Sequence, residues 1–165
     1  MSHSVTIRTT TTTTSGSTII LNTSYLRTFP GILKFLEVAL GIVCVGIMGH
    51  DHDTHYAEAL ASTPRIFFLL MTTTFMIASF ILLISCLASL STGSIISKTI
   101  YEVIYHSIGF GLLLAASLNL LVDITKTRYR PHNYDAILAA SIMGLVNAAL
   151  YLMSTILALR SYRGI

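Results

Sequence analysis

Long apolar runs without a charged residue dominate the pattern of hydrophobic and polar positions along this chain. No Lys, Arg, Asp or Glu lies within 66–97, 103–122 or 136–159. A helix of about 20 apolar residues crosses the hydrocarbon core of a bilayer, so each run can form one span. A fourth run qualifies if Lys34 and Glu37 lie in its first turns. We expect four transmembrane helices, over about 32–49, 66–90, 101–122 and 137–159.

Only helices and closed barrels satisfy their backbone hydrogen bonds inside a bilayer. The apolar runs lack the alternation of barrel strands and are too long for them. The predicted fold class is therefore all-α: an integral membrane protein with a four-helix transmembrane bundle. The Thr/Ser-rich composition of residues 1–24 predicts a disordered tail. We expect a solvated tail, with a phosphorylated one as the alternative. Residues 25–162 form the membrane domain, and residues 163–165 form a short C-terminus.

Basic residues bear on the orientation of the four spans. Six of the ten lie on the side of the two termini and four lie on the other side. Cytoplasmic segments are richer in Lys and Arg, so this count favours both termini in the cytoplasm, although the loop 123–135 with its three basic residues argues the other way. The sequence Asn22-Thr23-Ser24 is a glycosylation acceptor, which stays bare if the N-terminus is cytoplasmic.

The composition narrows the function classes. Apolar residues make up 53% of the chain and charged residues 10%, against about 25% charged residues in a soluble domain. A nucleic-acid module and most soluble enzymes are excluded. The sequence shows no phosphate-binding loop, nucleophile elbow or HExxH motif, and we expect no catalysis, no cofactor and no small-molecule substrate.

Small residues recur at every fourth position in the third and fourth predicted spans. Transmembrane helices approach closely at such faces. The expected helix-packing residues are Ser107, Gly111, Ala115, Ala140, Gly144 and Ala148. We expect the two stripes to pack against each other. The alternative is that one stripe faces outward and drives oligomerisation.

Polar residues within the spans are candidates for function. Lys34 lies three positions before Glu37, so a local ion pair is available. We expect Glu37 to make an interhelical polar contact, with a proton or ion relay as the alternative. Glu102 and His106, one turn apart, predict an interfacial pair. Asn147 is expected to help pack the fourth helix.

The first loop contains a cluster of imidazoles and carboxylates: His50, Asp51, His52, Asp53 and His55. Such side chains bind zinc, and the imidazoles would gain charge in an acidic lumen. The spacing matches no standard metal site, so we expect a solvated luminal loop, with metal binding and pH sensing as alternatives.

Two further features lie near the ends of spans. Cys86 is expected to be a packed thiol, with S-palmitoylation as the alternative. The fourth helix is expected to end near Leu159, which leaves Tyr162 as an interfacial anchor beside two arginines. Alternatively, Tyr162 and Ile165 form a sorting signal of the kind that clathrin adaptors bind.

The start of the first span reads YLRTFPGILKFLEV from residue 25 to residue 38. It resembles the opening of a MARVEL domain, in particular the branch of MAL, plasmolipin and the chemokine-like factors. The matching residues are Leu26, Arg27, Pro30, Gly31, Leu33 and Glu37. The resemblance covers about 25–162 and implies an M-shaped bundle with both termini cytoplasmic. Some relatives pair cysteines in their luminal loops, and this chain has none there.

The resemblance also implies a non-enzymatic role in organising the membrane during vesicle trafficking, membrane apposition or cell fusion. The implied location is the plasma membrane or secretory-pathway vesicles. The implied partners are the lipid bilayer and either further copies of the chain or other membrane proteins. A small transporter or channel subunit is the alternative, although transporters usually contain broken helices or repeats, which this sequence does not show.

Overall fold

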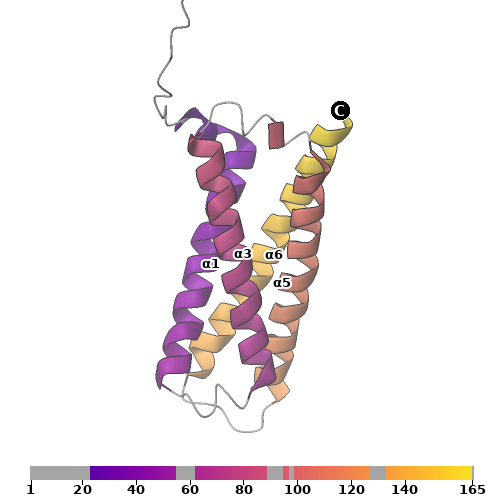
Figure 1. The fold of residues 1–165 in the computed structure, drawn as a ribbon. Helices are drawn as coiled ribbons and strands as arrows, with labels where there is room; N and C mark the ends of the chain where they lie inside the picture. The colour runs from indigo at the N-terminus through magenta and orange to yellow at the C-terminus, as the bar shows by residue number, and fades with distance from the viewer. Residues whose placement is uncertain (1–22, 55–61, 89–94, 97–98, 127–132, 165) are drawn as a thin grey trace, which may run out of the picture.

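Four long α-helices lie side by side in the computed structural model (Figure 1). The structure describes residues 23–54, 62–88, 95–96, 99–126 and 133–164, and structural statements below concern these residues. A short 3-10 helix, η1 (Thr23–Arg27), comes first. The long helices are α1 (Phe29–Thr54), α3 (Thr63–Ala88), α5 (Ile100–Lys126) and α6 (Tyr134–Arg163).

Each long helix is long and apolar enough to cross a membrane, which confirms the predicted all-α fold with four spans. The helices extend beyond the predicted spans at every end except that of α3, which ends at Ala88 rather than near residue 90. The segment after residue 49 continues the α1 helix to Thr54, and α6 continues past Leu159 to Arg163. A helix of 26 residues is about 39 Å long at 1.5 Å per residue, whereas the hydrocarbon core is about 30 Å thick. A helix therefore need not end at the bilayer boundary.

The end of α6 has a specific cause. Gly164 has a positive φ of 70°, and its backbone N–H donates to the carbonyl oxygens of Arg160 and Ser161. A left-handed glycine of this kind caps the last carbonyls of a helix. Tyr162 therefore lies within the last helical turn, 48% exposed, rather than in an extended tail. Ile165 lies outside the described residues.

The helices form a ring in which α1 packs against α3 and α6, and α5 packs against α3 and α6. The most extensive contact is between α5 and α6. In Figure 1, η1 and the C-terminus lie at one end of the bundle. We call this the terminal end. The end of α1 and the start of α6 lie at the opposite end.

The exposed surface of the bundle is apolar on all four helices. Ile42, Leu70, Ile108 and Ile156, one from each helix, are each more than half exposed. Conversely, charged side chains such as Lys34, Glu37 and Glu102 are buried. Exposed apolar patches this extensive are rare on soluble monomers. The arrangement fits a molecule whose surroundings are lipid.

The two small-residue stripes differ in their surroundings. In α6, Ala140, Gly144 and Ala148 are buried in the bundle. In α5, Ser107, Gly111 and Ala115 lie on the exposed face, so the expected contact of that stripe with α6 is wrong for this chain. A set of inward-facing residues takes its place: Glu102, His106, Gly109, Leu113, Ala116, Ser117 and Leu120. The side chains of Glu102 and His106 must turn away from lipid. The stripe that begins at Ser107, directly after His106, therefore faces outward.

Gly144 allows α6 to approach its neighbours closely. A Cβ added there would lie 2.5 Å from Ser117 Oγ and 2.6 Å from the Phe68 ring. A Cβ added at Gly111 would meet nothing within 4 Å. These two glycines therefore form a matched pair on neighbouring helices.

We expect Gly144→Ala to lower the free energy of unfolding by about 1–3 kcal/mol, the usual cost of overpacking. Gly111→Ala should leave it unchanged or raise it by up to about 1 kcal/mol through helix propensity. Equilibrium unfolding of the two purified variants in detergent micelles measures both effects. Equal stabilities would contradict the close approach.

Candidate functional site

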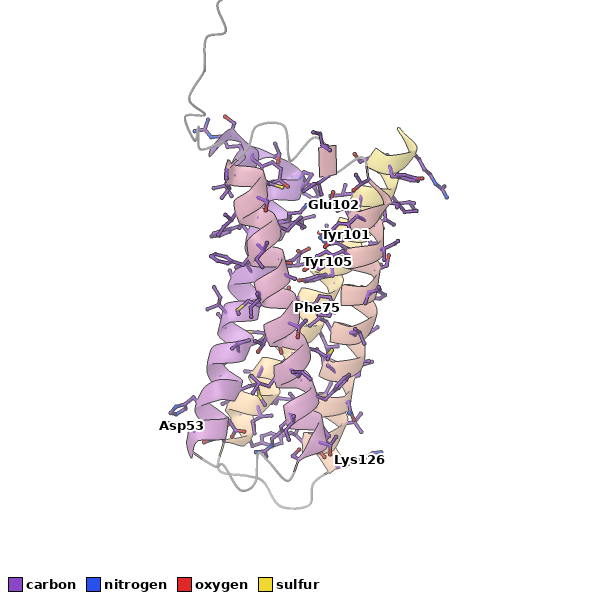
Figure 2. The ribbon with its side chains drawn as sticks, in the orientation of Figure 1. Asp53, Phe75, Tyr101, Glu102, Tyr105 and Lys126 are labelled. Atoms are coloured by element: carbon purple, nitrogen blue, oxygen red, sulfur yellow. The ribbon has the colours of Figure 1, made fainter. Side chains whose placement is uncertain are left out.

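A polar cluster lies inside the bundle towards the terminal end. Figure 2 labels Glu102 nearest this end, with Tyr105 and Phe75 further down the bundle. Lys34 Nζ donates to Glu102 Oε1, and both side chains are almost fully buried. This ion pair connects α1 to α5, which are not adjacent in the ring. A buried pair of this kind is costly to break, because it leaves one charge without a partner.

Glu37 is the point where the four helices meet. Its side chain is fully buried. Ser154 Oγ of α6 donates to Oε1 at 2.5 Å, and Ser79 Oγ of α3 donates to Oε2 at 3.4 Å. His106 of α5 places Nε2 3.7 Å from Oε2. The carboxyl group therefore contacts a polar side chain from each of the other three helices.

Two tyrosines extend this network. Ser79 Oγ lies 2.9 Å from the hydroxyl of Tyr105 and 2.6 Å from that of Tyr151. Both hydroxyls also lie within hydrogen-bond distance of the backbone carbonyl oxygen of Phe75, at 3.3 and 3.1 Å. The rings pack together, with the Tyr105 ring edge-on to the His106 ring at 4.9 Å. The hydroxyls thus form a connected chain that reaches Glu37 through Ser79.

The local ion pair available to Lys34 and Glu37 does not form, and Glu102 and His106 meet through a backbone oxygen. Lys34 binds Glu102 instead of Glu37, because side chains three positions apart diverge once each finds a partner on another helix. His106 contacts the backbone carbonyl of Glu102 through Nδ1 at 2.8 Å, and the Glu102 carboxylate is bound to Lys34. The expectation that Glu37 makes an interhelical polar contact matches the observed geometry.

The 3-10 helix η1 packs against the terminal end of this cluster. A Cβ at Gly31 would lie 2.1 Å from the carbonyl oxygen of Tyr25, so only glycine permits this approach. Burial raises the pKa of the Tyr25 hydroxyl to about 12, and this hydroxyl interacts with Lys34 and Cys86. Cys86 is 1% exposed. Its thiol is packed in the interior rather than displayed for S-palmitoylation.

The residues that carry the MARVEL resemblance lie in η1 and at the start of α1, where these two helices contact each other. Gly31, Leu33 and Glu37 are buried, and Leu26 is half-buried. Arg27 and Pro30 are exposed. Of the buried members, Gly31 admits the close approach of η1, and Glu37 carries the central carboxyl group.

A second polar cluster lies at the opposite end. Arg65 Nη1 donates to Asp51 Oδ2 at 3.1 Å, and Asn133 Nδ2 donates to Asp51 Oδ1 at 3.4 Å. Asp51 therefore connects α1 to α3 and to the start of α6. Ser62 Oγ donates to Asp123 Oδ2 at 3.2 Å, which connects α3 to α5.

These contacts bear on the His/Asp cluster expected in the first loop. Within the described residues no three potential ligands gather as a metal site would need. Asp51 is buried in the contact with Arg65, and Asp53 is exposed at the end of α1 (Figure 2). His55 and the side chain of His52 lie outside the described residues.

A cavity of about 120 Å³ borders the terminal polar cluster. Its lining residues are Pro30, Lys34, Glu102, Ser154, Leu157, Ala158 and Ser161. Ser154 both lines this cavity and donates to Glu37. The cavity therefore extends the polar cluster towards Ser161, which is exposed in the last turns of α6.

The sequence analysis did not single out several residues of these clusters, among them Ser79 and Ser154. A pattern in the sequence does indicate them. Polar or small residues recur at seven-residue intervals on every helix, and all of them are buried. The sets are Glu37, Cys44 and Asp51 in α1; Thr72, Ser79 and Cys86 in α3; Glu102, Gly109 and Ala116 in α5; and Ala140, Asn147 and Ser154 in α6. A seven-residue period keeps one face towards a supercoiled neighbour. This period would have identified the interior face.

Removal of one partner of the buried ion pair should be costly. We expect Lys34→Met to lower the free energy of unfolding by about 3–5 kcal/mol, because Glu102 would remain buried without its counter-ion. Arg160→Met, an exposed basic residue near the end of α6, should change it by less than about 0.5 kcal/mol. Unfolding in detergent micelles compares the two. Similar losses in both variants would contradict this role of the pair.

Comparison with known proteins gives one match. The family profile of MARVEL, described as a membrane-associating domain, matches residues 25–157, which is more than half of the chain. No curated protein and no solved structure matches the chain. The matched range begins in η1 and includes α1, α3, α5 and most of α6. The resemblance seen at the start of α1 thus extends over the whole bundle, and the chain belongs to the MARVEL family of membrane-associating domains.

Proposed function

We propose that this chain is a non-enzymatic, multi-pass membrane protein that organises the bilayer in vesicle trafficking, membrane apposition or fusion. The observation that carries the proposal is the MARVEL match over 25–157. The proposal places the protein at the plasma membrane or in secretory-pathway vesicles, within the branch of MAL, plasmolipin and the chemokine-like factors.

The distribution of polar groups supports this role. The buried charged side chains Lys34, Glu37, Glu102 and Asp51 all bind partners within the chain. The surface along the helices is left to apolar residues. A molecule of this kind acts through its contacts with lipid and with neighbouring membrane proteins.

The outward face of α5 supports lateral association as part of the same proposal. Ser107, Gly111 and Ala115 form a shallow strip on an otherwise bulky apolar surface. Without a hydrophobic drive between helices in lipid, close backbone approach at small residues is what holds two of them together. A second copy of the chain is the proposed partner on this strip.

The orientation belongs to the proposal as well. Residues 1–24 form a cytoplasmic tail, the membrane domain spans 25–162, and 163–165 return to the cytoplasm. The placement of η1 and the C-terminus at one end of the bundle supports a common side for both. The excess of basic residues on that side supports the cytoplasm.

An epitope tag at Met1 and another at Ile165 should both be inaccessible to antibody until the plasma membrane is permeabilised. Asn22 should carry no glycan, because glycosylation acts on the luminal side. Immunofluorescence of the two tagged proteins, with glycosidase treatment of the first, measures this. Staining of either tag at the surface of intact cells would refute the orientation.

Depletion of the protein from cells that express it should slow the delivery of a secretory reporter to the cell surface, and the wild-type chain should restore it. Gly111→Leu should fold but restore delivery poorly, because the added side chain blocks the α5 strip. Val146→Leu, at a lipid-exposed position of α6, is the matched control and should restore delivery fully.

Different results would contradict the proposed trafficking or apposition role and the proposed lateral association. Normal delivery and normal membrane apposition after depletion would contradict the proposed function. Full rescue by Gly111→Leu, with an unchanged number of copies per cluster in single-molecule photobleaching, would contradict lateral association alone.

A further inference from the structure

The hydrogen-bond partners of His106 fix where its hydrogen lies. Nδ1 is 2.8 Å from the backbone carbonyl oxygen of Glu102. A carbonyl oxygen only accepts, so Nδ1 must carry a hydrogen. In a neutral imidazole the other nitrogen then has a lone pair and no hydrogen. Nε2 of neutral His106 is therefore an acceptor.

This acceptor faces another acceptor. Nε2 lies 3.7 Å from Glu37 Oε2, and both side chains are fully buried. Nε2 has no hydrogen-bond partner among the described residues. An ionised carboxylate also only accepts. Two lone pairs would thus face each other in the interior, unless one of the two groups carries an additional proton.

We propose that Glu37 and His106 share one proton and form a buried proton-binding site where the four helices meet. With the proton on Nε2, imidazolium donates to carboxylate. With the proton on Oε2, the carboxyl group donates to neutral imidazole. Both forms convert the opposed acceptors into a donor and an acceptor, and both have the same net charge.

The charges around the pair lead to the same conclusion. The titratable groups nearest to it are Tyr105 of α5 and Tyr151 of α6, whose hydroxyls reach Glu37 through Ser79. The Lys34–Glu102 ion pair joins α1 and α5 on the same interior faces, and Cys86 of α3 and Tyr25 of η1 interact with Lys34. Lys34 and Glu102 cancel each other. Without the shared proton the interior carries one uncompensated negative charge, and with it none. An unpaired buried charge is much more costly than a neutral hydrogen-bonded pair.

A cavity lies beside the site at the terminal end. Ser154 donates to Glu37 Oε1 and also lines this cavity of about 120 Å³. A space of this size can hold water. Its lining continues to Ser161, which is exposed near the end of α6. The Ser154 hydroxyl therefore lies between the Glu37 carboxyl group and the cavity.

The site makes stability depend on pH with a defined sign. Above about pH 7.5 an unfolded chain has neutral His106 and ionised Glu37, so the unfolded pair binds no proton while the folded pair binds one. Stability then falls as pH rises, and the ratio of folded to unfolded protein should drop about tenfold per pH unit. Between about pH 5 and 6 both states bind one proton and the ratio should be flat.

Glu37→Gln provides the test. The glutamine amide N–H can donate to the lone pair on His106 Nε2, so the folded protein no longer needs to bind an additional proton. Equilibrium unfolding of the full-length chain in detergent micelles is measured from pH 7.5 to 9. Relative to the wild type, Glu37→Gln should lose the tenfold decline per pH unit. The matched control Asp53→Asn, an exposed carboxylate of α1, should retain it. Equal slopes in the wild type and Glu37→Gln would overturn the proposal.

A measurement on the wild type alone covers the case in which Glu37→Gln does not fold. At pH 8, magic-angle-spinning NMR of the labelled protein reports both groups, with His106 assigned through its contact with Tyr105. The shared proton is supported either by nitrogen shifts of a doubly protonated imidazole or by a Glu37 carboxyl-carbon shift typical of the protonated acid. A neutral imidazole beside an ionised carboxylate refutes it.

Discussion

The hydrogen bonding of one buried carboxyl group sets the rotation of every helix in this bundle. Glu37 lies inside a molecule whose surroundings are apolar, so its oxygens must find partners within the chain. Ser79 and Ser154 donate to them from α3 and α6, and His106 of α5 faces the same carboxyl group at 3.7 Å. Once these side chains face inward, the orientation of the remaining residues on each helix follows from the helical repeat.

Between the polar clusters at the two ends, the interior is packed mainly by apolar side chains, with Thr72, Ser117, Ser141 and Asn147 buried among them. Cys44, Phe68, Ala116 and Ala140 pack between the Glu37 network and the Asp51–Arg65 pair. The middle contributes packing and close backbone approach, as at Gly144. The ends contribute directional contacts that fix the register of the helices along their length. Neither contribution alone would determine both the rotation and the register.

The sequence predicted the four helices well, because an uncharged run of this length has few other structures available in lipid. It predicted individual contacts poorly. The spacing of Lys34 and Glu37 describes one helix in isolation, whereas their partners lie on other helices. The Ser107 stripe failed for the same reason: a small-residue face can pack inward or face lipid, and the position of Glu102 and His106 decides between them.

The η1 contact was also beyond prediction from the sequence. Pro30 and Gly31 indicated a resemblance, but nothing in the pattern showed that the carbonyl of Tyr25 lies where a Gly31 side chain would be. Close backbone contacts depend on the packed geometry. The seven-residue recurrence of polar and small residues is the exception, since it is present in the sequence and coincides with the buried face.

The distance along the chain between the polar partners has a consequence for biosynthesis. Lys34 binds a residue 68 positions later, and Glu37 binds residues 42 and 117 positions later. During stepwise synthesis the first helix reaches the membrane with its charges unpaired, before α5 and α6 have been translated. Lys34 and Glu37 therefore reach their partners in α5 and α6 only late in synthesis. Completion of the last helix, rather than insertion of the first, is then the step that commits the protein to its final form.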